Sequence, residues 1–356
     1  MLGKWLGKKT ADKTAEKTAD DFSAQEREHL RQFRLPGYQG ALPENWFSRD
    51  QQQATLKLPF AAGQQVLKDL QDDAEVGHYQ WRLDCQIAKL RNSQPELPLV
   101  YGNVIAVSSG KGGVGKSSIA AQLAVALAQT GASVGLLDAD IYGPSMPTMM
   151  GGADEKQQID AQNKMQPHVR HGVHVSSLGY LADSKDAAIW RGPMASAALQ
   201  QLFRDTAWPR LDYMVVDLPP GTGDIQLTIA QKLPVTGAVV VTTPQNVATA
   251  DAEKGIAMFR KLGIPITGLV ENMSYYHCPS CGHEEAIFGH EGGRKTAAAH
   301  DVPLLAQLPL ASPIREALDH GEPLLVGSPD HELNAAVREM ATAVAAQLYQ
   351  QAQKSV

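Results

Sequence analysis

The chain has 356 residues, 43% of them hydrophobic and 20% charged, so it holds enough apolar residues for a large buried core and disorder throughout is excluded. A formal net charge of −6 is mild for this length, and no run of basic residues has the density of a nucleic-acid footprint, so nucleic-acid binding is disfavoured. Three cysteines are too few for a disulfide framework and favour a reducing, cytoplasmic compartment. No run of about 18 apolar residues occurs, so we expect neither export nor stable membrane association.

The first part of the chain divides into a tail and a small module. We expect a flexible tail over residues 1–22, because the near-repeat of Thr-Ala-Asp/Glu-Lys in it offers little to bury. Residues 23–97 then carry a strand-like TLKLPF, a helix-like QQVLKDLQ and a strand-like YQWRLDCQIAKL, which predict a small α+β module. The turn-rich segment Asn92 to Pro98 is the expected linker. Cys85 lies within the second strand pattern, where a buried small side chain is expected rather than a reactive thiolate.

Residues 98–356 are predicted to form a second, larger domain of the α/β class. Apolar strand candidates alternate with helical patterns, an order typical of a mostly parallel sheet with helices on both faces. The strands are almost continuously hydrophobic, as strands covered on both faces need to be. They are NVIAVSS, SVGLLDAD, VHVSSL, YMVVDLP, AVVVTT, ITGLVENM and LLAQLP. A terminal helix is expected over Leu333 to Gln351; packing on the sheet is favoured over membrane docking, because the helix carries little basic charge.

The most specific motif runs from Gly110 to Ser117 as GKGGVGKS, which satisfies GxxxxGK[ST] between a strand and a helix. Its glycines allow a tight turn whose N–H groups face phosphate oxygens, and the following helix presents its positive end to the same anion. Lys116 is then expected to meet the β- and γ-phosphates, and the Ser117 hydroxyl to coordinate Mg²⁺. The expected nucleotide-binding residues in this loop are Gly110, Lys111, Gly112, Gly113, Val114, Gly115, Lys116, Ser117 and Ser118.

The additional lysine, Lys111, makes the loop KGGVGKS, which resembles the deviant P-loop of the MinD/ParA class. In that class the extra lysine reaches the nucleotide of a partner subunit. The resemblance therefore implies an ATP-bound homodimer and catalytic roles for Lys111 and Lys116.

Three aspartates end predicted strands close to this loop. Asp138 and Asp140 alternate at one strand end and can face one side, and Asp217 ends YMVVD, where an acid typically accepts a hydrogen bond from a magnesium-bound water. By the MinD/ParA resemblance, Asp140 orients or activates the attacking water, and Asp138 helps to hold hydrated magnesium. Helix capping or a solvated strand end is the alternative for each aspartate taken singly. The glycines of the following LPPGTGD permit a backbone that responds to loss of the γ-phosphate.

A candidate metal site lies in HCPSCGH, where Cys278 and Cys281 are separated by two residues and can bind one metal centre. Two thiolates are not four, and Cys85 belongs to a different module. Two copies of the chain would supply four thiolates, a suitable set for one [4Fe–4S] cluster shared at the interface. Zinc with His277 or His283, a redox disulfide and unliganded cysteines remain alternatives.

Together these residues resemble the Mrp/ApbC group of iron–sulfur cluster carrier ATPases. The resemblance covers about Asn103 to Leu325 and is carried by GKGGVGKSS, LLDADIYGPSMP, RGPM, DLPPGTGD, ENMS and CPSCG in that order. It implies that Asn272 contacts the adenine base, which favours ATP over GTP. Many relatives carry a small assembly-type module with a reactive cysteine before the ATPase; residues 23–97 would be a degenerate version of it.

The resemblance implies a function: ATP hydrolysis coupled to carriage of an iron–sulfur cluster at a dimer interface, with transfer to apo iron–sulfur proteins. The expected cofactors are ATP, Mg²⁺ and an iron–sulfur cluster; [4Fe–4S] is the expected type, and [2Fe–2S] stays open because four cysteines serve either. The expected partners are a second copy, cluster donors and apo-proteins. A MinD/ParA-like positioning ATPase and a zinc-stabilised, nucleotide-dependent interaction protein are the alternatives. Absence of a basic patch and presence of the CxxC pair disfavour the positioning ATPase.

Overall fold

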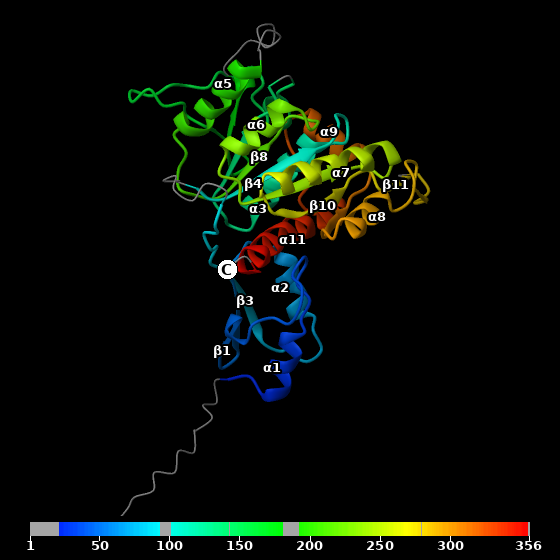
Figure 1. The fold of residues 1–356 in the computed structure, drawn as a ribbon. Helices are drawn as coiled ribbons and strands as arrows, with labels where there is room; N and C mark the ends of the chain where they lie inside the picture. The colour runs from blue at the N-terminus through cyan, green and yellow to red at the C-terminus, as the bar shows by residue number, and fades with distance from the viewer. Residues whose placement is uncertain (1–20, 93–100, 142, 181–191, 279, 355–356) are drawn as a thin grey trace, which may run out of the picture.

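The computed structural model describes residues 21–92, 101–141, 143–180, 192–278 and 280–354. Most of the expected tail, most of the expected linker and Arg191 of the RGPM motif lie outside these ranges. The described residues form a large sheet domain and a smaller N-terminal module, shown in Figure 1 with the module in blue below the sheet.

An eight-stranded sheet organises the larger domain, in the order β13-β10-β9-β4-β8-β5-β7-β6. All neighbouring strands are parallel except β6, which pairs antiparallel with β7 at one edge. The strands are β4 (Tyr101–Ser109), β5 (Val134–Asp138), β6 (His168–Arg170), β7 (Val173–Ser177), β8 (Leu211–Asp217), β9 (Gly237–Thr242), β10 (Ile266–Glu271) and β13 (Leu304–Gln307). The mostly parallel sheet and all seven predicted strands are confirmed; the short edge strand β6 was not predicted.

Helices cover both faces of this sheet. Alternate residues of β4 explain why: Ile105 and Val107 belong to one apolar cluster and Val104 and Ala106 to the other. Helices α3 and α11 pack in the first cluster, and α5, α6 and α7 in the second. The helices of the domain are α3 (Lys116–Gln129), α4 (Met146–Met149), η2 (Leu178–Tyr180), α5 (Gly192–Asp205), α6 (Asp224–Lys232), α7 (Asn246–Lys261), α8 (Gly292–Ala299), α9 (Ser312–Asp319), α10 (Leu324–Gly327) and α11 (Leu333–Lys354).

The N-terminal module is an α+β unit, as predicted, with a three-stranded sheet in the order β1-β2-β3. Its elements are α1 (Ala24–Arg31), η1 (Glu44–Trp46), β1 (Phe47–Asp50), β2 (Gln53–Leu58), α2 (Gln64–Gln71) and β3 (Gln80–Cys85). Strand β2 pairs antiparallel with β1 and parallel with β3. Phe22, at the end of the expected tail, is buried and stacks on Trp81 at 5.9 Å between ring centroids, so the module core begins before residue 23.

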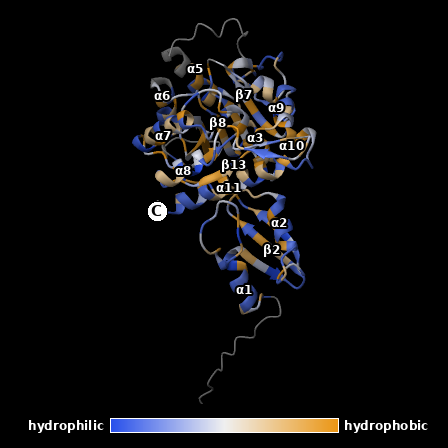
Figure 2. Ribbon diagram, turned by 90° about the vertical axis from the view of Figure 1, so that its right-hand side faces the viewer, coloured by the Kyte–Doolittle hydropathy of each residue, from blue (hydrophilic) through white to orange (hydrophobic). Residues whose placement is uncertain are grey.

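The module docks on helix α11, which lies between it and the large sheet (Figures 1 and 2). The rings of Trp46 and Phe60 pack against Tyr349, with centroids 6.1 and 5.7 Å away. The Gly63 amide donates to Thr342 Oγ1 at 3.1 Å, and Gln347 Nε2 donates to the Gly37 carbonyl. One apolar core therefore continues from the module through α11 into the sheet domain.

Helix α11 confirms the packing interpretation of the terminal helix. Val337, Met340, Ala341, Val344 and Leu348, the apolar face predicted from the sequence, are all buried in this core. Within the described ranges, no helix combines the length and apolar character needed to cross a bilayer.

Candidate functional site: a phosphate-binding loop beside a thiol pair

The loop between β4 and α3 has the backbone of a phosphate-binding loop. Gly113 and Gly115 adopt φ angles of +82° and +83°, which glycine tolerates and other residues rarely adopt. A Cβ atom on Gly115 would also lie 2.2 Å from the Asn272 side-chain nitrogen. Helix α3 begins at Lys116, so its unpaired N–H groups and positive end lie at the loop, as anion binding requires.

Lys116 is the buried centre of an ionic cluster. Its Nζ atom lies 2.5 Å from Asp217 Oδ1, 3.7 Å from Asp140 Oδ2 and 3.2 Å from Ser117 Oγ. The lysine is 5% exposed and Asp217 is completely buried. The parallel order β4-β8-β5 explains the cluster, because the loops after these three strands leave the same edge of the sheet.

Asp217 has the residual acceptor capacity that a bound cation uses. Its Oδ2 atom is buried and has no hydrogen-bond partner among the described residues, although Oδ1 is held by Lys116. Burial raises the pKa of Asp217, and the Lys116 ammonium opposes that effect. An unpartnered carboxylate oxygen beside the Ser117 hydroxyl fits an oxygen-liganded Mg²⁺ or one of its waters.

Asp138 is arranged differently from Asp217. Its carboxylate accepts from the Asp140 amide at 3.1 Å, from the Met146 amide at 3.1 Å and from Ser177 Oγ at 2.9 Å. Burial, with the charge of Asp217 close by, raises the pKa of Asp138 to about 7. The side chain thus holds the loop after β5 in place, including the backbone of Asp140.

The remaining residues of the loop differ in exposure. Lys111 is partly exposed, and its carbonyl accepts from Ser109 Oγ at 2.8 Å. Gly110 packs tightly on α7, since a Cβ there would lie 2.1 Å from the Asp251 carbonyl oxygen. The side chains of Ser117 and Ser118, in the first turn of α3, are partly exposed.

Asn272 joins the loop to the end of β10. It is 9% exposed, and its Nδ2 atom donates to the Val114 carbonyl at 2.9 Å. The structure therefore brings Asn272 against the nucleotide loop, and its contact with the adenine base stays a prediction.

The loop after β8 is also tied to the phosphate loop. Gly221, with φ +97°, donates its amide to the Ser109 carbonyl at 2.9 Å. Gln226 of α6 is buried and donates to Ser108 Oγ at 2.5 Å. Sequence reasoning did not single out Gln226; its place two residues after the glycine-rich DLPPGTGD was the available signal.

The thiol pair lies on a small hairpin that follows β10. Strands β11 (Tyr276–His277) and β12 (Glu284–Glu285) pair antiparallel, and the Cys278 amide donates to the His283 carbonyl at 2.9 Å. Cys278 is partly exposed, Cys281 is exposed, and both are free thiols. Backbone N–H groups of Ser280 and Cys281 face the Cys278 sulfur and lower its pKa, which favours the thiolate that binds metals.

Within the described part of one chain, Cys278 and Cys281 have few neighbouring side chains that could bind a metal with them. Among the described residues, no group of three or more His, Cys, Asp or Glu side chains is arranged to hold a metal ion. His277 Nδ1 lies 3.5 Å from Glu284 on the hairpin. Cys85 lies at the end of β3 in the N-terminal module, and among the described residues it does not join the thiol pair as a third ligand. Burial raises its pKa.

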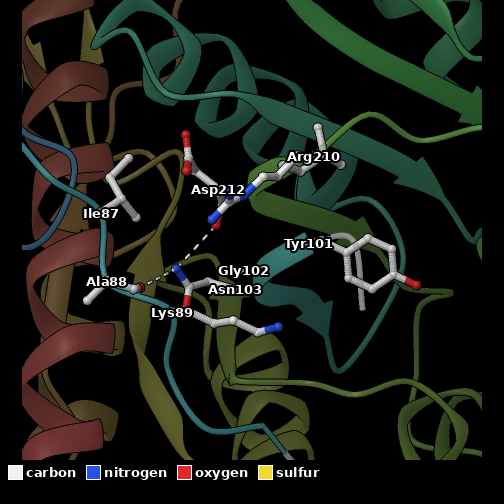
Figure 3. Close-up of a pocket in the computed structure, with 9 residues that line it drawn as sticks. Ile87, Ala88, Lys89, Tyr101, Gly102, Asn103, Arg210 and Asp212 are labelled. Atoms are coloured by element: carbon white, nitrogen blue, oxygen red, sulfur yellow. Dashed lines mark hydrogen bonds between the residues drawn. The ribbon is translucent and has the colours of Figure 1, made fainter. Parts of the chain in front are cut away.

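A cavity of about 330 Å³ lies at the opposite, amino-terminal edge of the sheet (Figure 3). At its centre the Asn103 amide donates to the carbonyls of Ala88 and Asp212, at 3.0 and 3.1 Å, and its oxygen accepts from the Leu90 amide. Asn103 therefore holds the chain that leaves the module against β8. The cavity takes no part in the nucleotide site.

A parallel sheet with this loop, its buried lysine and its strand-end acids defines a P-loop NTPase. Within that class, residues 101–345 match the ParA-type family described as NUBPL iron-transfer P-loop NTPases. The chain belongs to this family, which confirms the resemblance drawn from its motifs.

Known proteins agree with this assignment. The chain is 55% identical over 273 residues, 76% of its length, to a Salmonella typhimurium protein named iron-sulfur cluster carrier protein, of which 74% is covered. It is 49% identical over 64% of its length to the iron-sulfur cluster transfer protein NUBPL of Dictyostelium discoideum, covering 71% of that protein.

Solved structures show the same architecture. A nucleotide-binding protein of Archaeoglobus fulgidus in complex with ADP, with cobalt found in it, is 37% identical and superposes with a TM-score of 0.56 over 62% of this chain and 87% of that one. The cell division ATPase MinD of Pyrococcus furiosus, 22% identical with a TM-score of 0.54, covers 68% of this chain and 98% of its own, and shows the fold alone.

Proposed function

We propose that this protein is an ATP-dependent iron–sulfur cluster carrier that holds its cluster between two copies of the chain through Cys278 and Cys281. The observation that carries the proposal is the position of the two free thiols. They lie on the hairpin that follows β10, with Cys278 six residues after Asn272, which is itself bonded to the phosphate loop. Relatives about half identical in sequence are named for cluster carriage, and the chain shares their family.

The ligand arithmetic supports a cluster shared by a homodimer. One chain supplies two adjacent thiols, and within the described ranges no third His, Cys, Asp or Glu side chain joins them to complete a metal site. Four thiolates are the usual set for a [4Fe–4S] or [2Fe–2S] cluster, so two hairpins meeting across a twofold axis complete it. An exposed Cys281 leaves the cargo accessible to an apo-protein that accepts it.

The nucleotide chemistry uses the ionic cluster around Lys116. Loop amides and Lys116 bind the phosphates of ATP, and Asn272 meets the adenine base. Ser117 and the free oxygen of Asp217 would hold Mg²⁺ or one of its waters, and this cation would neutralise charge that develops on the phosphates. Asp140, held in place by Asp138, orients the attacking water. Lys111 reaches the nucleotide of the second copy.

Cytoplasmic location and apo iron–sulfur proteins as partners follow from the same proposal. Free thiols and a thiolate-bound cluster both require a reducing compartment. Nucleotide state would change how the two hairpins meet, and hence how firmly the cluster is held.

The test is anaerobic reconstitution followed by absorption spectroscopy with iron and sulfide assays. We expect a broad band near 400 nm, on the order of that seen for thiolate-to-iron charge transfer, and about two iron atoms per chain for one [4Fe–4S] cluster per dimer. Cys278→Ser with Cys281→Ser should abolish the band, whereas the matched control Cys85→Ser should keep it. A colourless wild type that binds stoichiometric zinc, or a double variant that stays brown, would refute the carrier proposal.

Coupling to ATP is tested separately by cluster transfer to an apo-ferredoxin. We expect ATP with Mg²⁺ to change the transfer rate of the wild type and to leave that of Lys116→Ala unaffected. Equal transfer by the variant and by the wild type with ATP would show that hydrolysis and transfer are independent.

A further inference from the structure

Glu271 is a fully buried carboxylate at the end of β10 that the nucleotide chemistry does not use. Its Oε1 atom accepts from Ser274 Oγ at 2.8 Å and from Gln307 Nε2 at 2.7 Å. Its Oε2 atom accepts from the Gly293 amide in the first turn of α8. A buried carboxylate is costly unless it is fully hydrogen-bonded, so this one is retained against a substantial desolvation penalty.

The surrounding residues are shaped for this carboxylate. A Cβ on Gly293 would lie 2.8 Å from Glu271 Oε2, so the close approach of α8 requires glycine there. Arg294 donates to Gln307 Oε1 at 2.7 Å, which turns the Gln307 amide nitrogen toward Glu271. The positive end of α8 also favours a negative group at this position. Three elements, β10, β13 and α8, are therefore fastened together at one side chain.

Glu271 opens the segment that runs from the nucleotide loop to the thiols. On one side, the side chain of Asn272 donates to the Val114 carbonyl of the loop, and its backbone amide donates to the Thr242 carbonyl of β9. On the other side, Cys278 follows β11. Five residues lie between Asn272, which contacts the loop, and Cys278, the first thiol.

Four of the five residues between these two points, Ser274 to His277, are held by a described contact. Met273 adopts φ +55°, which fixes a sharp turn. The Ser274 amide donates to the Leu308 carbonyl at 2.8 Å, and the Tyr275 carbonyl accepts from the Leu310 amide at 2.7 Å. Tyr276 bridges to Leu310 in parallel and pairs with Glu285 in the hairpin. The segment between Asn272 and the hairpin is therefore constrained by the contacts of Ser274, Tyr275 and Tyr276, so a displacement of Asn272 would be passed on to the hairpin.

We propose that Glu271 is a positioning residue that couples the nucleotide site to the thiol pair, by anchoring residues 271–277 as a rigid link between the phosphate loop and Cys278. The inference rests on the proposed function in one respect, namely that nucleotide binds at this loop. It does not require that a cluster is bound. Nucleotide that shifts Asn272 shifts the hairpin with it, because Glu271 fixes the angle at which the segment leaves β10.

The test measures alkylation of the metal-free, reduced full-length protein by iodoacetamide, with and without a saturating non-hydrolysable ATP analogue and Mg²⁺. Mass spectrometry reads Cys278 and Cys281 separately, and Cys85 in the module serves as an internal reference. In the wild type we expect the nucleotide to change the alkylation rate of the pair by about fivefold or more, the lower end of ordinary coupling between sites.

Glu271→Gln removes the charge at nearly constant volume and leaves one donor without an acceptor. We expect it to bind nucleotide and to lose the nucleotide effect on the thiols. Glu316→Gln is the matched control, because it removes a charge from the exposed surface of α9, away from the Glu271 network, and it should keep the full effect. If Glu271→Gln does not fold or bind nucleotide, Ser274→Ala, which removes one donor, takes its place and should at least halve the effect.

The outcomes are separable from those of the carrier test. A nucleotide effect that persists unchanged in Glu271→Gln, or in Ser274→Ala where that variant is used, overturns the coupling role. So does a wild type whose thiols do not respond to nucleotide. Either result leaves cluster binding by the thiol pair standing, since that is measured by reconstitution. If the protein failed to bind a cluster but nucleotide still changed the alkylation rate, the carrier proposal would fall and the coupling role of Glu271 would stand.

Discussion

A matched pair of glycine substitutions tests whether the module is fixed on α11. Gly37 and Gly40 have φ angles of +74° and +89°, so alanine at either costs about 1–2 kcal/mol of backbone strain. A Cβ on Gly37 would lie 2.5 Å from the Cα and carbonyl oxygen of Ala343, well inside van der Waals contact. A Cβ on Gly40 would meet nothing within 4 Å. The two variants therefore differ in the contact with α11 and share the strain.

The clash at Gly37 involves helix backbone, which cannot move aside as a flexible side chain would. Overpacking of this kind costs about 1–3 kcal/mol in addition to the strain. We expect Gly37→Ala to lower the free energy of unfolding by about 2–5 kcal/mol and Gly40→Ala by about 1–2 kcal/mol. The shift of α11 would also loosen the hydrogen bond from Gln347 to the Gly37 carbonyl.

Urea denaturation followed by tryptophan fluorescence measures both variants, and limited proteolysis reports whether the module is released. Gly37→Ala should expose the module to protease in buffer, whereas Gly40→Ala should be cleaved no faster than the wild type. Equal unfolding free energies and equal cleavage of the two variants would refute the docking contact as a source of stability.

Three further predictions concern groups with described partners. The pKa of Asp73 is lowered, because hydrogen bonds from His29 and two backbone amides outweigh the raising effect of burial. Asp73→Asn should therefore cost about 1 kcal/mol of stability at pH 7, with the difference from the wild type in thermal denaturation closing as the pH falls below about 4. Alkylation of Cys278 should reach its plateau rate at lower pH than that of Cys85, whose pKa burial raises; coincident pH–rate profiles would contradict this. Tyr213→Phe should destabilise the protein by about 1–3 kcal/mol in urea titrations, because it leaves a buried module amide without its acceptor.

The sheet and the phosphate loop could be predicted because their signals are local. Buried parallel strands read as continuous apolar runs, and the glycines around Lys116 are needed at fixed positions by the backbone itself. The edge strand β6 and helix α1 were not predicted, since short, partly exposed elements carry weak periodicity. The same holds for β1, whose four residues alternate between partial and full exposure.

Contacts between distant elements could not be predicted from one sequence. Glu271 reads as the polar end of a strand, and its burial depends on Gly293 and Gln307, which lie 22 and 36 residues further on. Asp138 and Asp217 have similar sequence positions at strand ends, yet protein donors surround the first, whereas the second keeps an oxygen without a partner among the described residues. The distinction depends on which loops fold over each carboxylate.

The docking of the module on α11 has a consequence for biosynthesis. Gly37 and its partner Gln347 are separated by 310 residues, so the ribosome makes the module long before the helix that completes its core. At ordinary rates of synthesis the interval is roughly 15 to 60 s. During that time the rings of Trp46 and Phe60 lack Tyr349, and the nascent module presents an aromatic surface to the crowded cell. Its protection at that stage would have to come from a chaperone or from a temporary contact within the growing chain.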